Sequence, residues 1–250
     1  MAKVIQMLNV WTDKYGAQYT QDRKRLLRGP DCEHYTILEG TEEIADRAFS
    51  HNESLRSVVI PDTVTSMGMS VFGFCSSLES CVIPKSVTEI AKGAFMSCIS
   101  LRHVSLPNTL LCIEGGAFHR CISLERIEIP ESVQSIGTPA FSGCKCEIIF
   151  KSTFYQVIDK ALYGYNGVCM MHCPTDAKTI KILNTVGNIA KNAFCMCSEL
   201  EEITFPRLVL NIDQFTFGTC PSLKRIIIPK GTKDDFAKWL PTQRDLLVEV

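Results

Sequence analysis

Residues 124–144 read LERIEIPESVQSIGTPAFSGC, and this phrase returns along the chain with a period of 23 residues. The phenylalanines that mark the period are Phe49, Phe72, Phe95, Phe118 and Phe141, followed by Phe194 and Phe217. A fixed period of about 20–30 residues is typical of a stacked array, in which each unit buries its apolar face only against its neighbours. The repeat therefore predicts a solenoid of coils around one continuous core.

Each unit predicts a short strand followed by an apolar return path. In the segment 124–130, Ile127 and Ile129 alternate with polar residues, which favours a strand, and Pro130 ends it because proline has no N–H for a ladder. A unit of this length has no room for a crossover helix, so the strands are expected to stack in parallel. The return path repeats apolar residues in three inward-facing columns. These are Val64, Val87, Leu110 and Val133; Met67, Ile90, Ile113 and Ile136; and Ala48, Ala94, Ala117 and Ala140.

Six of the 13 cysteines share one register, immediately after the Ala-Phe pair. They are Cys75, Cys98, Cys121, Cys144, Cys197 and Cys220. Equivalent positions of a stack face one another, so these thiols are expected to form a buried file. Free cysteine behaves in a core as a small hydrophobic residue. We therefore interpret them as structural thiols rather than as disulfides or metal ligands.

The period is interrupted once, because Cys144 and Cys197 are 53 residues apart. The added segment, 154–174, reads FYQVIDKALYGYNGVCMMHCP, and its Asn166-Gly167 pair is a strong signal for a β-hairpin turn. The segment 16–30 aligns with 160–174 without a gap, so a similar hairpin is expected near the start. We expect one hairpin with five coils, then a second hairpin with two more.

The chain end departs from the repeat. Residues 232–241, TKDDFAKWLP, predict a short amphipathic helix with Thr232 as its N-cap and Phe236, Trp239 and Leu240 on one face. Such a helix would cover the last core layer of an open stack, and DLLVEV at 245–250 predicts a closing strand. The predicted divisions of the chain are an N-terminal cap and hairpin at 1–31, a first repeat block at 32–150, an inserted hairpin at 151–176, a second repeat block at 177–229 and a C-terminal cap at 230–250.

Charge and apolar patterning exclude several classes of partner. Charged residues make up 21% of the chain and the net charge is -1, so electrostatic capture of nucleic acid or of an anionic membrane is not expected. No apolar run is long enough to span a bilayer. The first 16 residues, MAKVIQMLNVWTDKYG, lack the features of a secretory signal, which predicts a cytoplasmic location.

The sequence offers little catalytic chemistry. It has no G-x-S-x-G, H-E-x-x-H or P-loop motif, and GTPAFSGCK from Gly137 has the wrong glycine spacing and belongs to the repeat. A group of possible metal ligands comprises Cys169, His172, Cys173, Cys195 and Cys197. The paired C-x₂₋₄-C knuckles of structural zinc sites are absent, and Cys197 is explained by the thiol file. We therefore predict no enzyme, no cofactor and no metal, with a metal-dependent regulator as the least favoured alternative.

The outward face of the strands is the most promising site. The residue after each leading Leu alternates in charge through Arg56, Glu79, Arg102 and Glu125, and these positions are lateral neighbours in a parallel stack. One interpretation is that each Arg pairs with the next Glu. The other is a mixed-charge surface for a protein partner. The candidate binding residues are Arg56, Glu79, Arg102, His103, Glu125, Arg126, Glu128, Glu201, Glu202, Lys224 and Arg225.

The repeat resembles the BspA-type leucine-rich repeat family, whose hallmark is similar to L-x-x-I-x-I-P-x-S-V-x-x-I-G-x-x-A-F-x-x-C. The interposed hairpin and residues 228–239, IPKGTKDDFAKW, also resemble features of that family, and the likeness covers roughly residues 11–240. It implies an α/β solenoid, mostly β, in which short parallel strands form a right-handed leucine-rich repeat superhelix with two β-hairpin insertions and a C-terminal capping helix.

For function, the resemblance implies a non-catalytic scaffold that binds a protein partner through its concave strand face. Several relatives are adhesins, so the alternative is a cell-surface or secreted adhesin that binds host protein or glycan. We expect a monomer, and association of copies edge to edge is left open.

Overall fold

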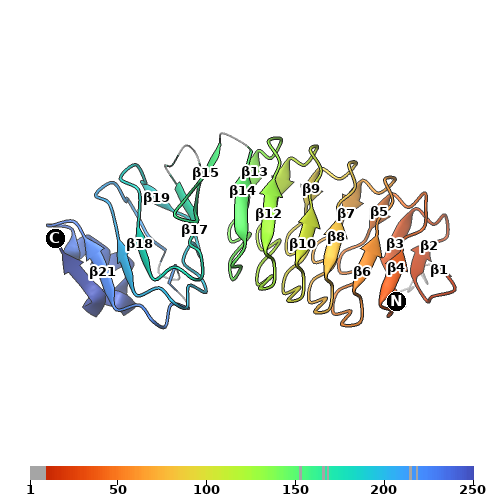
Figure 1. Cartoon of the computed structure of the whole chain (residues 1–250), viewed down its shortest axis with the longest axis horizontal. Coiled ribbons are helices and arrows are strands. Elements are labelled where there is room, and N and C mark those ends of the chain that lie inside the picture. Colours follow the sequence, from red (N-terminus) through yellow and green to blue (C-terminus); the bar gives the residue numbers. More distant parts are fainter. Residues whose placement is uncertain (1–9, 152–153, 165–166, 168, 214–215, 218) are drawn as a thin grey trace, which may run out of the picture.

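The repeat units form an elongated stack of coils, with β1 (Val10–Thr12) at one end and the C-terminus at the other (Figure 1). This computed structural model describes residues 10–151, 154–164, 167, 169–213, 216–217 and 219–250. Each coil contributes one strand to a face that we call the strand face, and most coils contribute a second, two-residue strand to the opposite side. The prediction of a mostly β solenoid with parallel strands is confirmed.

The strand face consists of three parallel sheets. Their strands are β4 (His34–Thr36), β6 (Ser57–Val59), β8 (Ser80–Val82) and β10 (His103–Ser105); β12 (Arg126–Ile129) and β14 (Glu147–Phe150); and β18 (Thr179–Lys181), β20 (Glu202–Thr204), β21 (Arg225–Ile228) and β22 (Leu247–Glu249). The register follows the sequence period, since His103 lies opposite Ser80 and Ser57 lies opposite Ser80 from the other side.

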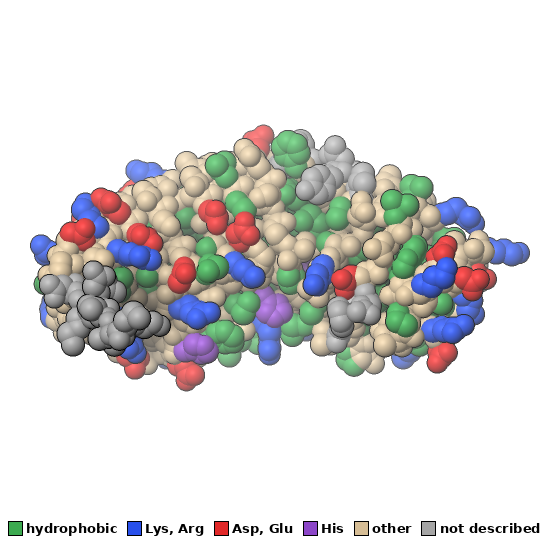
Figure 2. Space-filling view, turned by 180° about the vertical axis from the view of Figure 1, so that it is seen from behind, with side chains coloured by type: hydrophobic (Ala, Val, Ile, Leu, Met, Phe, Trp, Pro, Cys, Tyr) green, Lys and Arg blue, Asp and Glu red, His purple; other side chains and the backbone are tan. Residues whose placement is uncertain are grey.

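The short strands of the return path lie behind the strand face. They are β5 (Glu43–Ile44), β7 (Ser66–Met67), β9 (Glu89–Ile90), β11 (Cys112–Ile113), β13 (Ser135–Ile136) and β19 (Asn188–Ile189). Figure 2 shows this side of the molecule, where acidic and basic side chains are interspersed without a large area of one sign. The described residues of this face therefore form no continuous basic surface of the kind that binds a polyanion.

The in-phase phenylalanines stack on one another through the core. From Phe49 to Phe141, consecutive ring centroids are 5.2 to 5.6 Å apart, and Phe194 and Phe217 are 5.0 Å apart. The three predicted columns of the return path are buried as expected. The alanine of each Ala-Phe pair leaves space for the adjacent ring, because a larger side chain would meet it at this packing density.

The core is not one continuous column, however, and this expectation is wrong at the interruption of the repeat. The buried apolar residues form two clusters, and the division falls within the inserted segment. Leu162 and Met171 pack into the first cluster, whereas Tyr163 and Met170 pack into the second. Adjacent residues of a strand point to opposite faces, so the inserted strands present one face to each cluster and separate the two.

Each inserted segment is a three-stranded meander rather than the predicted two-stranded hairpin. The first comprises β1 (Val10–Thr12), β2 (Gln18–Thr20) and β3 (Arg25–Arg28), and the second comprises β15 (Tyr155–Ile158), β16 (Ala161–Gly164) and β17 (Cys169–His172). The first and second strands of each pair antiparallel, and so do the second and third. The third strand of each then pairs in parallel with a return strand, β5 or β19, and so joins the stack.

The two meanders match in detail. In both, the register of pairing shifts at the same place, between Gln18 and Tyr19 in one and between Leu162 and Tyr163 in the other. The turn between β15 and β16 was not predicted from the sequence. Its residues Asp159 and Lys160 both have positive φ (50° and 63°), which is the geometry of a type I′ turn. Of the predicted Asn-Gly turn, Asn166 lies outside the described residues. The predicted boundaries of the inserted segment, at residues 151 and 176, stay a prediction.

The cysteine file does more than fill space. Cys98 Sγ donates a hydrogen bond to the Phe72 carbonyl of the preceding coil at 3.0 Å, and that carbonyl also accepts the N–H of Cys75. The same thiol contact recurs at 2.9 to 3.1 Å from Cys75, Cys121, Cys144 and Cys220. In the first coil Asn52 occupies the cysteine register and donates instead to the Pro30 carbonyl. All cysteines are free, and five of the six in the file are buried while Cys220 is partly exposed. Burial raises the pKa of Cys75 to about 12.

We predict that alanine and serine substitutions rank differently at two buried cysteines. Cys98→Ala removes the donor to Phe72 and is expected to cost about 1–2 kcal/mol, whereas Cys98→Ser keeps a donor and costs less. Cys81 is buried but donates no hydrogen bond among the described residues, so Cys81→Ser is expected to cost more than Cys81→Ala. Urea denaturation measures both pairs. The same ranking at both positions would show that the thiol contact contributes nothing.

The C-terminal end of the stack is closed by α1 (Lys233–Trp239) and a 3₁₀ helix (Pro241–Leu246), with β22 as the predicted closing strand. Phe236 and Leu240 are buried, as the amphipathic pattern predicts. Thr232 stands at the N-cap but its side chain does not cap the helix, and its hydroxyl donates to Pro229 instead. The N–H groups of residues 231–233 donate to Glu249 Oε1 at 2.9 to 3.1 Å, so a carboxylate from β22 stabilises the helix start.

Candidate protein-binding face

The strands from β4 to β14 present alternate side chains to solvent. In β8 and β10 the central residue is buried and both flanking residues are exposed, as expected for a strand with one face on the core. Parallel pairing in register places the outward residues in columns. One column is His34, Ser57, Ser80 and His103, and another is Thr36, Val59, Val82 and Ser105.

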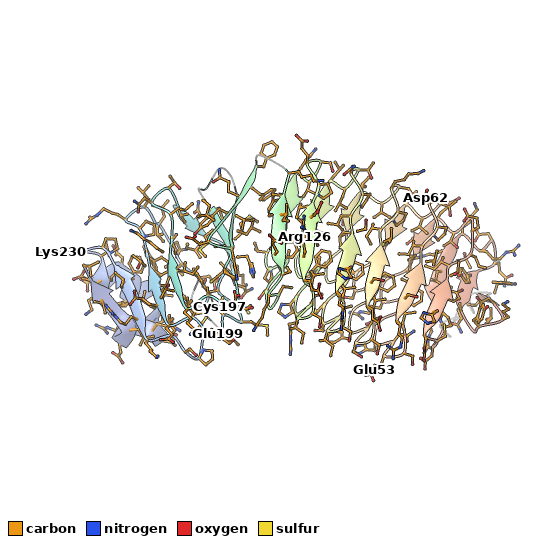
Figure 3. All side chains as sticks on the ribbon, in the orientation of Figure 1. Glu53, Asp62, Arg126, Cys197, Glu199 and Lys230 are labelled. Atoms are coloured by element: carbon orange, nitrogen blue, oxygen red, sulfur yellow. The ribbon has the colours of Figure 1, made fainter. Side chains whose placement is uncertain are left out.

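The predicted binding residues of the first block lie along this face. Arg56, Glu79, Arg102 and Glu125 stand just before their strands and are exposed, as are His103, Arg126 and Glu128 in β10 and β12. Figure 3 shows Arg126 on the strand face at the middle of the stack, whereas Glu53 and Glu199 lie at its lower edge. Glu201, Glu202, Lys224 and Arg225 belong to the second block, and the structure does not bring them next to the first set.

Internal ion pairing explains only some of these charges. Arg56 lies 2.8 Å from Glu79, and in the second block Lys224 lies 2.8 Å from Glu201 and Arg225 lies 3.1 Å from Glu202. Hydrogen bonding to Lys224 lowers the pKa of Glu201. These pairs are at least partly exposed, so solvent screening makes the contribution of each to stability small.

Arg102 and Glu125 are different. Within the part of the chain that the structure describes, neither has an oppositely charged group within 4.0 Å. The series of ion pairs between neighbouring coils therefore stops after Glu79, and the predicted pairing of each Arg with the next Glu does not extend to Arg102. Two charges without an internal partner remain beside each other in the stack, where they can meet a partner's charges.

A hollow of about 290 Å³ lies on the strand face beside these two residues. It is lined by His103, Val104, Ser105, Leu106, Arg126 and Glu128, from β10, β12 and their borders. It lies where the strand-face sheet changes from the β4–β10 group to the β12–β14 group. Within β12, Arg126 lies 2.7 Å from Glu128, and this contact lowers the pKa of Glu128. Sequence reasoning selected three of the lining residues but gave no sign of the break in the sheet.

The face also exposes apolar surface that the sequence analysis missed. Val59 and Val82 are 57% and 67% exposed and occupy neighbouring places in one column. The signal was present, because valine stands at the outward position of LRSVVIP and LESCVIP, where the next coils have Ser105 and Glu128. An apolar pair next to unpaired charges and a hollow is the arrangement expected at the centre of a protein interface.

Three of the possible metal ligands have other surroundings. Cys197 Sγ donates to the Cys173 carbonyl at 3.6 Å, Cys173 Sγ donates to the Pro174 carbonyl, and His172 is buried beside Leu162, Met171 and residues 136–141. Among the described residues, no group of three or more His, Cys, Asp or Glu side chains is arranged to hold a metal ion. None of the described helices is long and apolar enough to cross a bilayer.

Stacked coils with in-register parallel strands and an exposed strand face define a leucine-rich repeat solenoid. A family model, the BspA type leucine-rich repeat region, matches residues 27–148 and 168–237 in six copies. The chain belongs to this family. The family and the fold are those of a repeat scaffold, which places this chain among proteins suited to protein interaction or to a surface-repeat role.

Solved structures with the same fold are distant in sequence. A leucine-rich cell surface protein of Faecalibacterium prausnitzii is 23% identical over 88% of each chain, with a TM-score of 0.54. The pneumococcal vaccine antigen PcpA is 17% identical, with a TM-score of 0.67, over 86% of this chain and 53% of its own. A leucine-rich repeat protein of Bacteroides ovatus is 19% identical, with a TM-score of 0.50, over 96% of this chain and 73% of its own. No curated protein matched the sequence.

Proposed function

We propose that the chain is a non-catalytic scaffold that binds a protein partner through the strand face of its first block. The observation that carries the proposal is that three features lie on neighbouring coils of this face: the exposed Val59–Val82 pair, the unpaired Arg102 and Glu125, and the hollow between β10 and β12. Val82 lies opposite Ser105, which lines the hollow. Apolar area supplies affinity, while unpaired charges at its border set register and specificity. The proposal includes a cytoplasmic location, as predicted from the sequence.

A double charge reversal tests this face. After a partner has been isolated with the full chain and identified, Arg102→Glu combined with Glu125→Arg is expected to weaken its binding at least about tenfold, or about 1.4 kcal/mol. The melting temperature is expected to stay unchanged, because both side chains are exposed and unpaired. Isothermal titration calorimetry and thermal unfolding measure the two quantities.

A matched control reverses two charges elsewhere. Lys92 and Glu131 are also exposed, and neither has an ion-pair partner among the described residues. Lys92→Glu with Glu131→Lys is expected to leave affinity within about twofold. If the control weakens binding as much as the strand-face variant, or if neither does, the partner binds elsewhere and the proposal fails.

A second candidate function is a surface adhesin that binds host protein or glycan. The description of the Faecalibacterium prausnitzii protein as a cell surface protein favours it, although the similarity at 23% identity supports the fold alone. Cell fractionation separates the two candidates. Recovery of the chain solely from the soluble fraction supports the scaffold, and recovery from the cell surface or the medium supports the adhesin.

A further inference from the structure

The two matching meanders lie in different surroundings. Their inward residues correspond, since Tyr19 and Tyr163 are both buried in the core of the block that follows them. Their outward residues differ. Leu162 and Met171 are buried against the preceding coil, whereas their counterparts Gln18 and Leu27 are partly exposed. The internal meander therefore shows what covers this element when a coil precedes it.

At the internal junction, residues 136–141 of the fifth coil line the small cavity beside Leu162 and Met171. The turn that follows, residues 142–145, makes the polar contacts with the second block. Ser142 Oγ donates to the Cys195 carbonyl at 3.0 Å, and Thr175 Oγ1 donates to the Cys144 carbonyl at 3.2 Å. Lys145 Nζ lies 3.7 Å from Glu199 Oε1. A hydroxyl, a carbonyl and an ammonium of one turn thus dock the first block onto the second.

The corresponding surface at the N-terminal end is a hollow of about 590 Å³. Its lining includes Arg28, Asp31, Ser50, His51, Asn52 and Glu53, with the edge of Phe49. Asp31 corresponds to Thr175, Ser50 to Cys195 and Ser54, also in the lining, to Glu199. The hollow therefore stands where the turn 142–145 stands at the internal junction.

One backbone group in this hollow lacks the partner that the stack normally supplies. The carbonyls after Phe72, Phe95, Phe118 and Phe141 accept an N–H from the preceding coil; the Gly73 carbonyl accepts that of His51 at 2.9 Å and the Ser142 carbonyl that of Arg120 at 2.8 Å. At the internal junction the equivalent carbonyl, that of Cys195, receives the Ser142 hydroxyl. The Ser50 carbonyl receives no hydrogen bond from any described residue, so the hollow offers an acceptor in the place where the junction uses one.

We propose that this hollow is a docking site for the end coil of a second leucine-rich repeat polypeptide. The incoming turn places a hydroxyl or N–H donor on the Ser50 carbonyl. Because Asp31 replaces Thr175, the turn also carries a basic side chain, which faces Asp31 and Glu53. Gln18 and Arg28, in place of Leu162 and His172, make this face more polar than the internal junction, so the association is reversible. A copy of this chain is not the occupant, because α1 and β22 cover its C-terminal end.

The test supplies the coil at high effective concentration by linking it to the chain. Residues 1–154 are joined to residues 10–250, so that β1 follows an added first block as β15 does in the native chain. Hydrogen exchange is measured at the amides of residues 28, 29, 31 and 48–54 of the second part. Exchange there is expected to slow at least about tenfold relative to the chain of residues 10–250 alone.

Variants in the added block identify the contact. Ser142→Ala with Lys145→Glu is expected to restore fast exchange, whereas Lys92→Glu, at an exposed residue outside the turn, is expected to leave it slow. A second linked chain with a flexible spacer of about ten Gly and Ser residues allows the two parts to fold separately before docking. Unchanged exchange in both linked chains would overturn the proposal. So would faster exchange on removing residues 1–9 from the native chain, because the chain's own N-terminal segment would then be the occupant.

Discussion

Phe118→Ala is expected to lower the free energy of unfolding by about 3–5 kcal/mol, the range for truncation of a buried aromatic side chain. Phe118 is fully buried between Phe95 and Phe141, with centroid distances of 5.4 and 5.6 Å and nearly parallel rings. The substitution leaves a cavity in the middle of the ring stack, which the coils on either side cannot close because strand pairing fixes their spacing. Urea denaturation followed by circular dichroism measures the loss.

Glu125→Ala is the control for that measurement, because Glu125 belongs to the next coil but is exposed and unpaired. Its effect is expected to stay within about 0.5 kcal/mol. The divided core adds a second expectation. Hydrogen exchange after Phe118→Ala should accelerate in the first block and much less in the second, whose core cluster is separate. Equal urea midpoints for the two variants would contradict the assignment of inside and outside faces.

Lowering the pH from about 6.5 to about 4 is expected to destabilise the fold through His172. Burial lowers the pKa of His172 to about 4, from an ordinary value of 6.5. The small cavity beside its ring is otherwise lined by Leu162, Met171 and residues 136–141, none of which is charged. The unfolded chain therefore binds this proton at a higher pH than the folded chain does. Stability is fully present above pH 6.5 and falls by about 1.4 kcal/mol per pH unit below it, to a total of about 3 kcal/mol.

The contribution of His172 is isolated by comparing variants, because other groups also titrate in acid. His172→Leu is expected to reduce the loss of stability between pH 6.5 and 4 by about 3 kcal/mol. His103→Leu, at an exposed position on the strand face, is expected to leave the loss unchanged. Because His172 lies where the first block meets the inserted meander, exchange at the junction should accelerate first on acidification. A pH profile of His172→Leu that matches the native chain would show that this imidazole is protonated in the folded state.

The repeating part of the fold could be predicted residue by residue. The columns of Val87, Ile90 and Phe95, and the file of cysteines, follow from the period alone. In a stacked array each residue meets the residue one period away, so sequence spacing translates directly into contact. The same logic placed Arg56 beside Glu79 and the candidate binding residues along one face.

The parts that escaped prediction depend on contacts with no fixed spacing. The division of the core at the inserted meander, the carboxylate of Glu249 at the start of α1, and the break in the sheet between β10 and β12 are of this kind. Which charges remain unpaired, as at Arg102, depends on side-chain conformations that lie within a few tenths of a kcal/mol of one another. The period thus specified the solenoid and its inward and outward faces. Only the assembled chain decided where the core divides and which outward groups are left to meet a partner, because those outcomes are set by packing between segments that the repeat does not relate.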